Sequence, residues 1–299
     1  MIKLIATDMD GTLFYPKQRI RGIPDCNKKF LRRYLDNGGH LVCVSGRNGG
    51  IIPRVERQLH HKISLIGCNG AYFKQDGKTY DKYPMDRKKL AELFATFHRD
   101  FGVWLWMLFD EDDYLYCNTS NIPKWVELGF QYGNNMNLYF AEKLIRDDSL
   151  FLKRIAEHDN YKILMAFGLQ EAGRRKAEQA APSIISRFGD SFEVAVSGNA
   201  IEVTAKGINK GFGLENYIKA NGYTKDEVLV CGDSGNDLYM FDCFPHSFAM
   251  AQSPDHFKSQ ANHVIKRISD LEDYLNHPEW LENDVIKRVN FQKALEKDD

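Results

Sequence analysis

Four short apolar segments, each ended abruptly by small or polar residues, constrain the fold more than any other feature of this sequence. Their hydrophobic character is continuous rather than alternating, which is typical of parallel strands buried on both faces. A helix is predicted between the first two segments, and strand, helix and strand together form a right-handed crossover unit. The segments are Lys3–Thr7, His40–Val44, Ser64–Gly67 and Val228–Cys231, and the helix is Cys26–Asn37.

The same alternation of helix and strand returns after residue 206, beginning with a helix predicted over Gly211–Ala220. In the middle of the chain the pattern changes to amphipathic helices mixed with strand-like runs. The sequence therefore predicts an α/β protein in which residues 1–83 and 206–299 build one doubly wound parallel sheet and residues 84–205 form an inserted α+β domain. We assign no chemistry to the charged, helix-prone tail at 276–299.

The charge balance and the apolar runs exclude two classes of partner. With 40 Lys and Arg against 41 Asp and Glu, the chain lacks the excess of basic residues expected of a nucleic-acid-binding protein. Its longest strongly apolar run, Val103–Phe109, is too short to cross a bilayer, and its N-terminus has no signal-peptide pattern. We therefore expect a cytoplasmic protein with no nucleic-acid or membrane partner. The six cysteines form no CxxC pairs and are expected to be reduced thiols without a metal or redox role.

Two aspartates follow the first predicted strand, in the segment Asp8–Thr12 (Asp-Met-Asp-Gly-Thr). Open α/β sheets place their ligands at the carboxyl ends of strands, and residues two apart on an extended chain point to the same side. One carboxylate can attack phosphorus while the other, kept protonated, donates to the leaving oxygen and later takes a proton from water. A hard cation with oxygen ligands, such as Mg²⁺, would relieve the repulsion between the two charges. The alternative is a strand end followed by a solvated Asp-Gly turn.

Three further polar clusters stand at predicted strand or helix ends. Ser45–Asn48 (Ser-Gly-Arg-Asn) offers a hydroxyl and backbone N–H groups to a phosphate. Lys210, just before a predicted helix, can balance an acidic pocket and a transferring phosphoryl group. Gly232–Asp237 carries two more acids and suits a cation. Each cluster has an ordinary alternative: Ser45 as a helix cap, Lys210 as a solvated lysine, and Gly232–Asp237 as a Gly-rich turn. Together with Asp8–Thr12, however, there are four polar clusters at four element ends, and this favours a common site.

In order and spacing, these motifs resemble those of the haloacid dehalogenase (HAD) superfamily, and within it the Cof-type phosphatases with a large α/β cap, subclass IIB. Motif one matches as DMDGT at 8–12, motif two as SGR at 45–47, the motif-three lysine as NKG at 209–211 and motif four as GDSGND at 232–237. The resemblance covers nearly the whole chain. It implies a Rossmann-like catalytic core, at 1–83 and 206–299, with a cap at 84–205 that is seated over the active site and selects the substrate.

The resemblance also implies a role for each matching residue. Asp8 is the nucleophile and a metal ligand, and Asp10 is the general acid and base, whose backbone carbonyl also binds Mg²⁺. Asp233 binds the metal directly, and Asp237 supports it from nearby. Lys210 is the catalytic lysine that holds the phosphoryl group. The other residues implied to bind phosphate or substrate are Gly11, Thr12, Ser45, Gly46, Arg47, Asn69 and Asn236.

The chain departs from the family pattern after the last core strand. Where relatives often read AMGNA, this sequence has Ala-Met-Ala-Gln-Ser at 249–253, so a substrate contact by that Gly-Asn pair is not carried over. The cap is rich in aromatic residues, and we expect most of them to pack in its interior and one or two to face the substrate. These aromatic residues include Trp104, Trp106, Phe109, Tyr114, Tyr116 and Trp125.

The sequence thus predicts a Mg²⁺-dependent phosphomonoester hydrolase that acts through an aspartyl-phosphate intermediate. Its substrate is expected to be a small phosphorylated metabolite, such as a sugar phosphate, a nucleotide or a phosphorylated cofactor. Two alternatives remain open. A phosphomutase of the same superfamily shares the Asp8 and Asp10 pair and differs in where the phosphoryl group goes next. A non-catalytic binding or regulatory protein would keep the fold without the chemistry, although all four motifs retain their reactive residues.

Overall fold

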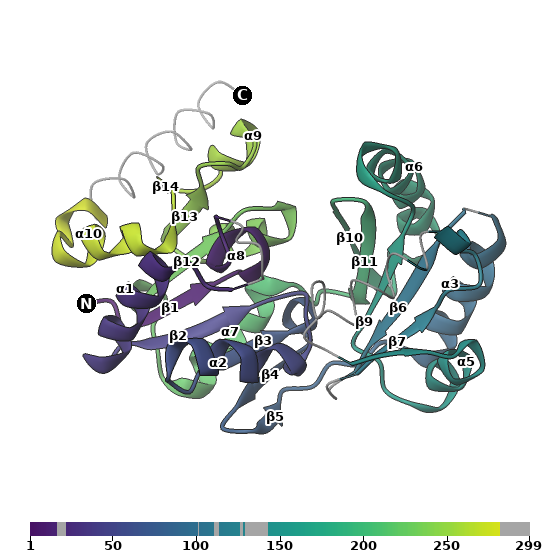
Figure 1. Cartoon of the computed structure of the whole chain (residues 1–299), viewed down its shortest axis with the longest axis horizontal. Coiled ribbons are helices and arrows are strands. Elements are labelled where there is room, and N and C mark those ends of the chain that lie inside the picture. The colour runs from purple at the N-terminus through teal and green to yellow at the C-terminus, as the bar shows by residue number, and fades with distance from the viewer. Residues whose placement is uncertain (17–21, 101, 111–113, 126–127, 129–142, 282–299) are drawn as a thin grey trace.

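The computed structural model describes the chain apart from residues 17–21, 101, 111–113, 126–127, 129–142 and 282–299, so most of the charged tail lies outside the described residues. Two β-sheets, each with its own helices, form two lobes (Figure 1). We call the eight-stranded sheet with its helices the core, and the six-stranded sheet with its helices the inserted lobe. Among the described helices, none combines the length and the hydropathy needed to cross a bilayer.

The core sheet has the strand order β14-β13-β12-β1-β2-β3-β4-β5. The first six strands in this order run parallel, and β4 and β5 continue the sheet antiparallel. The four strands predicted from continuous apolar runs are the adjacent strands β12, β1, β2 and β3, so the predicted parallel α/β fold is confirmed. The strands are β1 (Leu4–Thr7), β2 (His40–Val44), β3 (Ser64–Gly67), β4 (Tyr72–Gln75), β5 (Lys78–Tyr80), β12 (Val228–Gly232), β13 (His246–Met250) and β14 (His263–Ile265).

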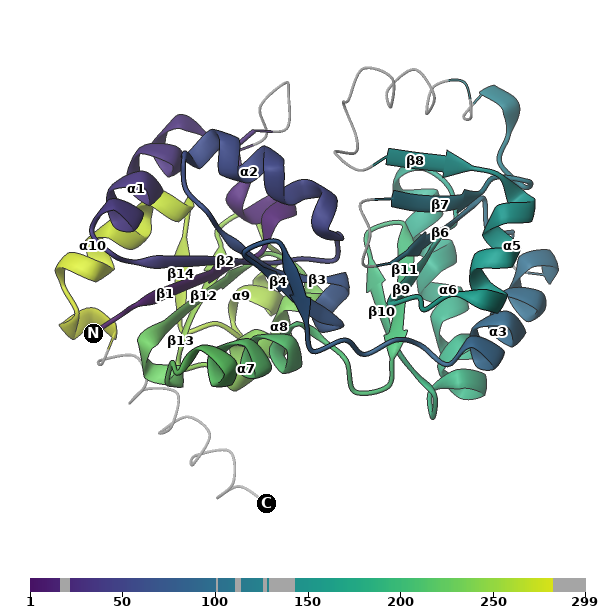
Figure 2. The ribbon, with the colours of Figure 1, turned by 90° about the horizontal axis from the view of Figure 1, so that it is seen from below.

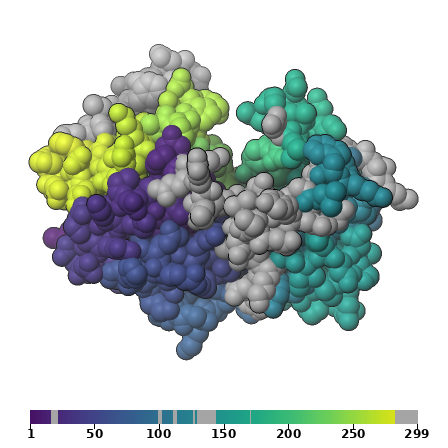
Figure 3. Space-filling view, viewed as in Figure 1, coloured from purple at the N-terminus to yellow at the C-terminus, as the bar shows by residue number. Residues whose placement is uncertain are grey.

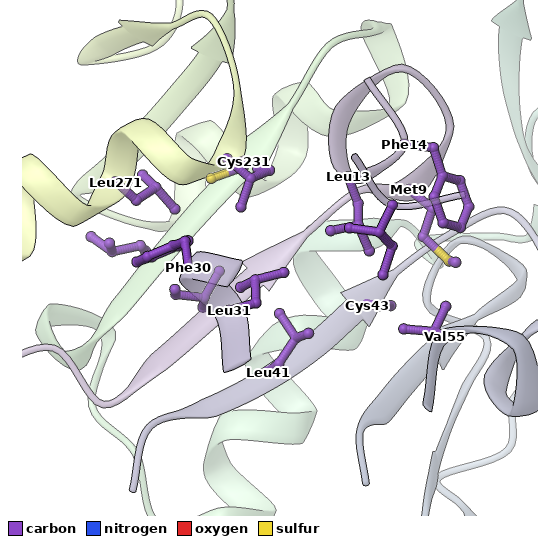
Figure 4. Close-up of a cluster of buried hydrophobic side chains, with 14 of the residues drawn as sticks. Met9, Leu13, Phe14, Phe30, Leu31, Leu41, Cys43, Val55, Cys231 and Leu271 are labelled. Carbon is purple, nitrogen blue, oxygen red and sulfur yellow. The ribbon is translucent and has the colours of Figure 1, made fainter. Parts of the chain in front are cut away.

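Helices cover both faces of the core sheet, which gives three layers (Figure 2). Alternate strand residues pack on opposite faces: Ile5 lies in the cluster with α1, α2 and α10, whereas Leu4 lies in the cluster with α7, α8 and α9. On the first face, Phe30 and Leu31 of α1 share one cluster with Leu41 (Figure 4). Burial on both faces explains the continuous apolar runs. The helices are α1 (Asp25–Asp36), α2 (Ile52–Leu59), α7 (Lys210–Asn221), α8 (Leu238–Cys243), α9 (Asp255–Lys258) and α10 (Leu271–Asn276).

The sheet of the inserted lobe has the order β10-β11-β9-β6-β7-β8. Its pairs are antiparallel except for β7 with β8, and helices α3, α5 and α6 cover one face. The opposite face turns toward the core, where Met107 and Leu115 share an apolar cluster with Cys68 and Tyr72. The elements are α3 (Arg87–Asp100), β6 (Leu105–Phe109), β7 (Tyr114–Asn118), β8 (Lys143–Arg146), α5 (Asp148–Glu157), β9 (Lys162–Ala166), α6 (Gln170–Phe188), β10 (Phe192–Ser197) and β11 (Ala200–Ala205).

The central core strands end at one edge, and the inserted lobe faces that edge. Strand β1 lies between β12 and β2, with Thr7 paired to Cys231 on one side and to Cys43 on the other. The residues that follow these strands therefore meet at the carboxyl edge, where α/β sheets bind their ligands. The space-filling view shows a notch between the two lobes at its upper edge (Figure 3), and a cavity between the lobes has walls from both.

Candidate active site

The turn after β1 presents Asp8 and Asp10. The backbone N–H of Asp8 donates to the carbonyl of Cys231 at 2.9 Å, which ties the start of the turn to β12. Gly11 has φ +94°, and a Cβ at this position would collide with the carboxylate of Asp233. Glycine is therefore required both for the backbone conformation and for the close approach. The carboxylate of Asp8 is buried, whereas that of Asp10 is about half exposed.

Lys210 joins two acidic loops. It is the first residue of α7, directly after Asn209, whose side chain caps the helix by accepting from the N–H of Phe212 at 3.0 Å. The Lys210 ammonium donates to Oδ1 of Asp8 and to Oδ1 of Asp237, both at 2.6 Å, and its side chain is only 1% exposed. Burial disfavours the charged ammonium, but the two carboxylates outweigh this effect and raise the pKa of Lys210. The lysine is therefore a permanent positive charge beside Asp8.

The loop after β12 is held by Asp237. Its Oδ2 accepts from the backbone N–H groups of Asp233 and Ser234, both at 3.0 Å, while its Oδ1 binds Lys210. Thr12 donates its hydroxyl to Oδ1 of Asp233 at 3.0 Å. Asp237 and Thr12 thus position Asp233 and the loop around it.

Three carboxylates converge beside this lysine. Asp8, Asp233 and Asp237 each offer an oxygen, and these oxygens lie within 4.8 Å of one another. Burial raises the pKa of Asp8, and burial followed by the charge of Asp237 raises the pKa of Asp233 to about 6. A cluster of oxygen ligands with excess negative charge is the donor set that Mg²⁺ prefers. The residues present therefore fit a divalent cation.

Asp10 pairs with Arg47 instead of joining that cluster. The guanidinium donates to Oδ2 of Asp10 at 2.6 Å from Nε and to Oδ1 at 3.0 Å from Nη2. This bidentate geometry fixes the orientation of the carboxylate. Arg47, which the family resemblance implies binds phosphate or substrate, contacts the carboxylate of Asp10 in this structure.

The loop after β2 interlocks with the loop after β3. The hydroxyl of Ser45 accepts from the N–H of Arg47 at 3.2 Å, and its carbonyl accepts from the N–H of Asn69 at 3.0 Å. Asn69 has φ +56° and accepts from the side-chain amide of Asn236 at 3.4 Å. These contacts bring together polar residues from three strand ends.

A cavity of about 170 Å³ lies between the lobes. Seven of the residues predicted to form the site line it: Asp8, Asp10, Ser45, Gly46, Arg47, Lys210 and Asn236. Thr12, Asp233 and Asp237 instead form the hydrogen-bonded layer beneath Asp8, and Asn69 bridges Asn236 to the inserted lobe. Gly11 provides the close approach to Asp233.

The segment that departs from the family pattern supports the loops after β1 and β12. Gln252 donates its amide to the carbonyl of Gly11 at 2.7 Å, and Ser253 donates its hydroxyl to the carbonyl of Asp233 at 2.8 Å. One short segment therefore holds the backbones of the first and fourth motifs in place.

Residues of the inserted lobe form most of the remaining cavity wall, and the sequence motifs did not identify them as site residues. Phe109 is one of the aromatic residues of this lobe and lines the cavity. Of the other aromatic residues, Trp106 and Tyr116 are buried and Trp125 is exposed. A signal for two others was available, since Lys162 and Glu202 are charged residues within apolar strand-like runs. The wall residues contributed by this lobe are Phe109, Lys162, Leu164, Ser197 and Glu202, and the core adds Ser234.

Comparisons with known proteins agree with this geometry. A family model described as haloacid dehalogenase-like hydrolase matches residues 5–272. The 5-amino-6-(5-phospho-D-ribitylamino)uracil phosphatase of Bacillus subtilis is 26% identical over 267 residues, which cover 88% of this chain and 89% of the relative. The pyridoxal phosphate phosphatase of Escherichia coli is 25% identical over 274 residues, which cover 88% and 93%. The solved structure of a HAD subclass IIB sugar phosphatase, 19% identical, covers 93% of this chain and 99% of its own with a TM-score of 0.70.

Proposed function

Because this chain belongs to the haloacid dehalogenase-like hydrolases and is a phosphatase of that family, we propose that it hydrolyses small phosphomonoesters through an aspartyl-phosphate on Asp8. The observation that carries this proposal is the buried contact between Asp8 and Lys210 at the wall of the cavity. Burial raises the pKa of Asp8, but the ammonium of Lys210, 2.6 Å away, stabilises the carboxylate form that attacks phosphorus, and the same ammonium offsets the charge of the phosphoryl group.

Asp10 is proposed as the general acid and base. A carboxylate oxygen of Asp8 bonds to phosphorus as the bond from phosphorus to the ester oxygen breaks, and Asp10 gives its proton to that oxygen. Water then attacks phosphorus, Asp10 takes a proton from it, and the bond between phosphorus and Asp8 breaks to release phosphate. Since Arg47 contacts both oxygens of Asp10, one of these contacts must be released before Asp10 can donate. Ser45 and Asn236 would bind the phosphoryl oxygens from the same cavity.

Mg²⁺ is the cofactor that we propose for the acidic cluster. Asp8 and Asp233 would hold it with their carboxylates and Asp10 with its backbone carbonyl. Asp237 would act from behind, because its oxygens already bind Lys210 and two backbone N–H groups. When bound, the cation would neutralise part of the charge on the phosphate and on the nucleophile.

We propose that residues 84–205 act as the cap that selects the substrate, because this lobe supplies one wall of the cavity. The relatives named above act on a phosphorylated ribitylamino-uracil and on pyridoxal phosphate, and a sugar phosphate, a nucleotide or a phosphorylated cofactor fits the same description. All six cysteines are free, which supports a cytoplasmic location.

Phosphate release from a panel of phosphomonoesters, with Mg²⁺ and after chelation, tests this function. We expect release that requires Mg²⁺ and needs no bisphosphate activator, and that falls about 10²-fold or more in Asp233→Asn. Mg²⁺ should also raise the unfolding temperature of the native protein more than that of the variant. A ligand that binds the folded state stabilises that state, and the variant has lost one of the carboxylates proposed to bind Mg²⁺. Transfer of phosphate within a substrate, without release, would favour a phosphomutase. Binding of esters without turnover would favour a regulatory protein.

A further inference from the structure

The face of the inserted lobe that looks at the core carries two buried charges. Lys162 is the first residue of β9, and Glu202 lies within β11. Their strand neighbours Ile163 and Ile201 pack on the opposite face, among the helices of the lobe. Since side chains alternate along a strand, Lys162 and Glu202 point toward the cavity, where Lys162 is 1% and Glu202 9% exposed.

The two side chains form an oriented ion pair. The ammonium of Lys162 donates to Oε1 of Glu202 at 3.1 Å and lies 4.0 Å from the centre of the Phe109 ring, its direct neighbour across the β6–β9 pair. Oε2 of Glu202 accepts from the amide of Asn69 in the core at 2.5 Å. Burial favours a neutral carboxyl, but Lys162 and Asn69 outweigh it and lower the pKa of Glu202. The carboxylate form of Glu202 is therefore favoured beside the Lys162 side chain.

The pair stands over the phosphate-binding loop. The ammonium of Lys162 lies so close to Gly46 that a Cβ added there would be 2.9 Å from it. With the phosphoryl group beside Asp8 and Lys210, the rest of an ester must extend toward the wall that contains Phe109, Lys162 and Glu202. The ion pair therefore lies on the wall toward which the leaving group extends.

A contribution to the stability of the fold does not by itself explain why this ion pair is buried here. A buried ion pair is commonly no more stable than apolar side chains of the same volume, and the surrounding strands are apolar. An ammonium has three N–H donors and a carboxylate about four acceptor positions, so the two groups can hold each other and still bind hydroxyl groups. A cavity of about 170 Å³ is smaller than pockets for drug-sized ligands, which span roughly 300–1,000 Å³, and this favours a small leaving group.

We propose that the Lys162–Glu202 pair binds hydroxyl groups of the leaving group and selects esters with an uncharged, hydroxyl-bearing leaving group over esters that carry a second anion. A second phosphate group would have to compete with Glu202 for the ammonium of Lys162, which lies 3.1 Å from Oε1 of Glu202. The carboxylate of Glu202 would also repel that phosphate. This inference rests on the proposed phosphatase function and adds a specificity role for two residues of the inserted lobe.

The test compares three substrates: glucose 6-phosphate, glucose 1,6-bisphosphate and acetyl phosphate, whose leaving group carries no hydroxyl. We expect the native enzyme to have a kcat/KM at least about tenfold higher for the monophosphate than for the bisphosphate. Lys162→Met should lower kcat/KM for glucose 6-phosphate about 10–100-fold, mainly through KM, and change that for acetyl phosphate less than about threefold. Glu202→Gln should shrink the preference for the monophosphate about tenfold.

Lys153→Met is the matched control, because Lys153 forms an exposed ion pair with Glu157 on α5 of the same lobe; it should leave all three rates unchanged. Equal losses of kcat/KM on glucose 6-phosphate and acetyl phosphate in Lys162→Met would overturn the inference. So would a native enzyme that hydrolyses the bisphosphate as well as the monophosphate, or one that does not hydrolyse glucose 6-phosphate. If Lys162→Met does not fold, the ratio in Glu202→Gln decides. Acetyl phosphate separates the two proposals. If the enzyme hydrolyses acetyl phosphate but shows no preference for hydroxyl-bearing leaving groups, only this inference is wrong. If it hydrolyses none of the three substrates, the proposed phosphatase function is wrong as well.

Discussion

Replacing Asp8 with Asn is expected to lower phosphate release by about 10⁴-fold or more while the protein stays folded. An amide oxygen cannot form the acyl phosphate, so the reaction loses its covalent route. The fold should tolerate the change, because Asp8 is one of three clustered acids and Lys210 keeps its contact with Asp237. We expect the free energy of unfolding to stay within about 1 kcal/mol of the native value or to rise.

The comparison of Asp8→Asn with Asp36→Asn checks this expectation. Asp36 is an exposed residue of α1 that pairs with His61, so its replacement should change neither turnover nor stability measurably. Steady-state phosphate release and urea unfolding, measured on the same preparations, separate a chemical effect from a folding effect. Retention of more than about a tenth of native turnover by Asp8→Asn would exclude Asp8 as the nucleophile.

Replacing Lys210 with Met should have a large effect on both activity and stability. Without the ammonium, the buried carboxylates of Asp8 and Asp237 lose their shared partner, and removal of one member of a buried ion pair costs about 3–5 kcal/mol. Turnover should fall about 10²-fold or more, because the charge that offsets the phosphoryl group is gone. Thermal and urea unfolding, together with phosphate release, measure the two effects.

Two further variants make the Lys210 prediction specific. Lys219→Met, on the exposed side of the same helix α7, should shift the free energy of unfolding by no more than about 0.5 kcal/mol. Adding Asp8→Asn to Lys210→Met should recover part of the lost stability, because one unpaired charge disappears. Equal stability of Lys210→Met and Lys219→Met would show that the buried ion cluster does not have the role assigned to it.

The four central strands of the core could be predicted from the sequence because each of them carries its own signal. Burial on both faces makes the strands continuously apolar, and the turn into the site ends each run with Gly, Ser, Asp or Asn. The strands expected at His40–Val44 and Ser64–Gly67 are the observed β2 and β3, and the one expected at Lys3–Thr7 begins one residue later. Such local signals need no knowledge of the partner strands.

In the inserted lobe, prediction was less complete, because its sheet pairs mostly antiparallel strands whose order depends on distant contacts. The mixture of helices and strands in this lobe was predicted, but no element was assigned to β8 or α5, and the order of the sheet was left undetermined. The short strand β8 has four residues, too few for a clear periodic pattern.

The same distinction applies to the site. Asp8, Ser45, Lys210 and Asn236 stand in contiguous motifs at element ends, so they could be named from the sequence. Glu202, however, meets Asn69 across 133 residues and Lys162 across 40. The only local signal for such a pair is a charged residue in an otherwise apolar strand. The tertiary structure is needed to show that the two residues meet at the cavity.

Chemical trapping of the intermediate tests the central claim most directly. Turnover is quenched in acid during steady-state hydrolysis, and borohydride then reduces any acyl phosphate to an alcohol, which converts the modified aspartate to homoserine. We expect peptide mass spectrometry to find homoserine at position 8 only when substrate and Mg²⁺ are present, and not in Asp8→Asn. Rapid hydrolysis with modification at another carboxylate would contradict the assignment of Asp8 as the nucleophile.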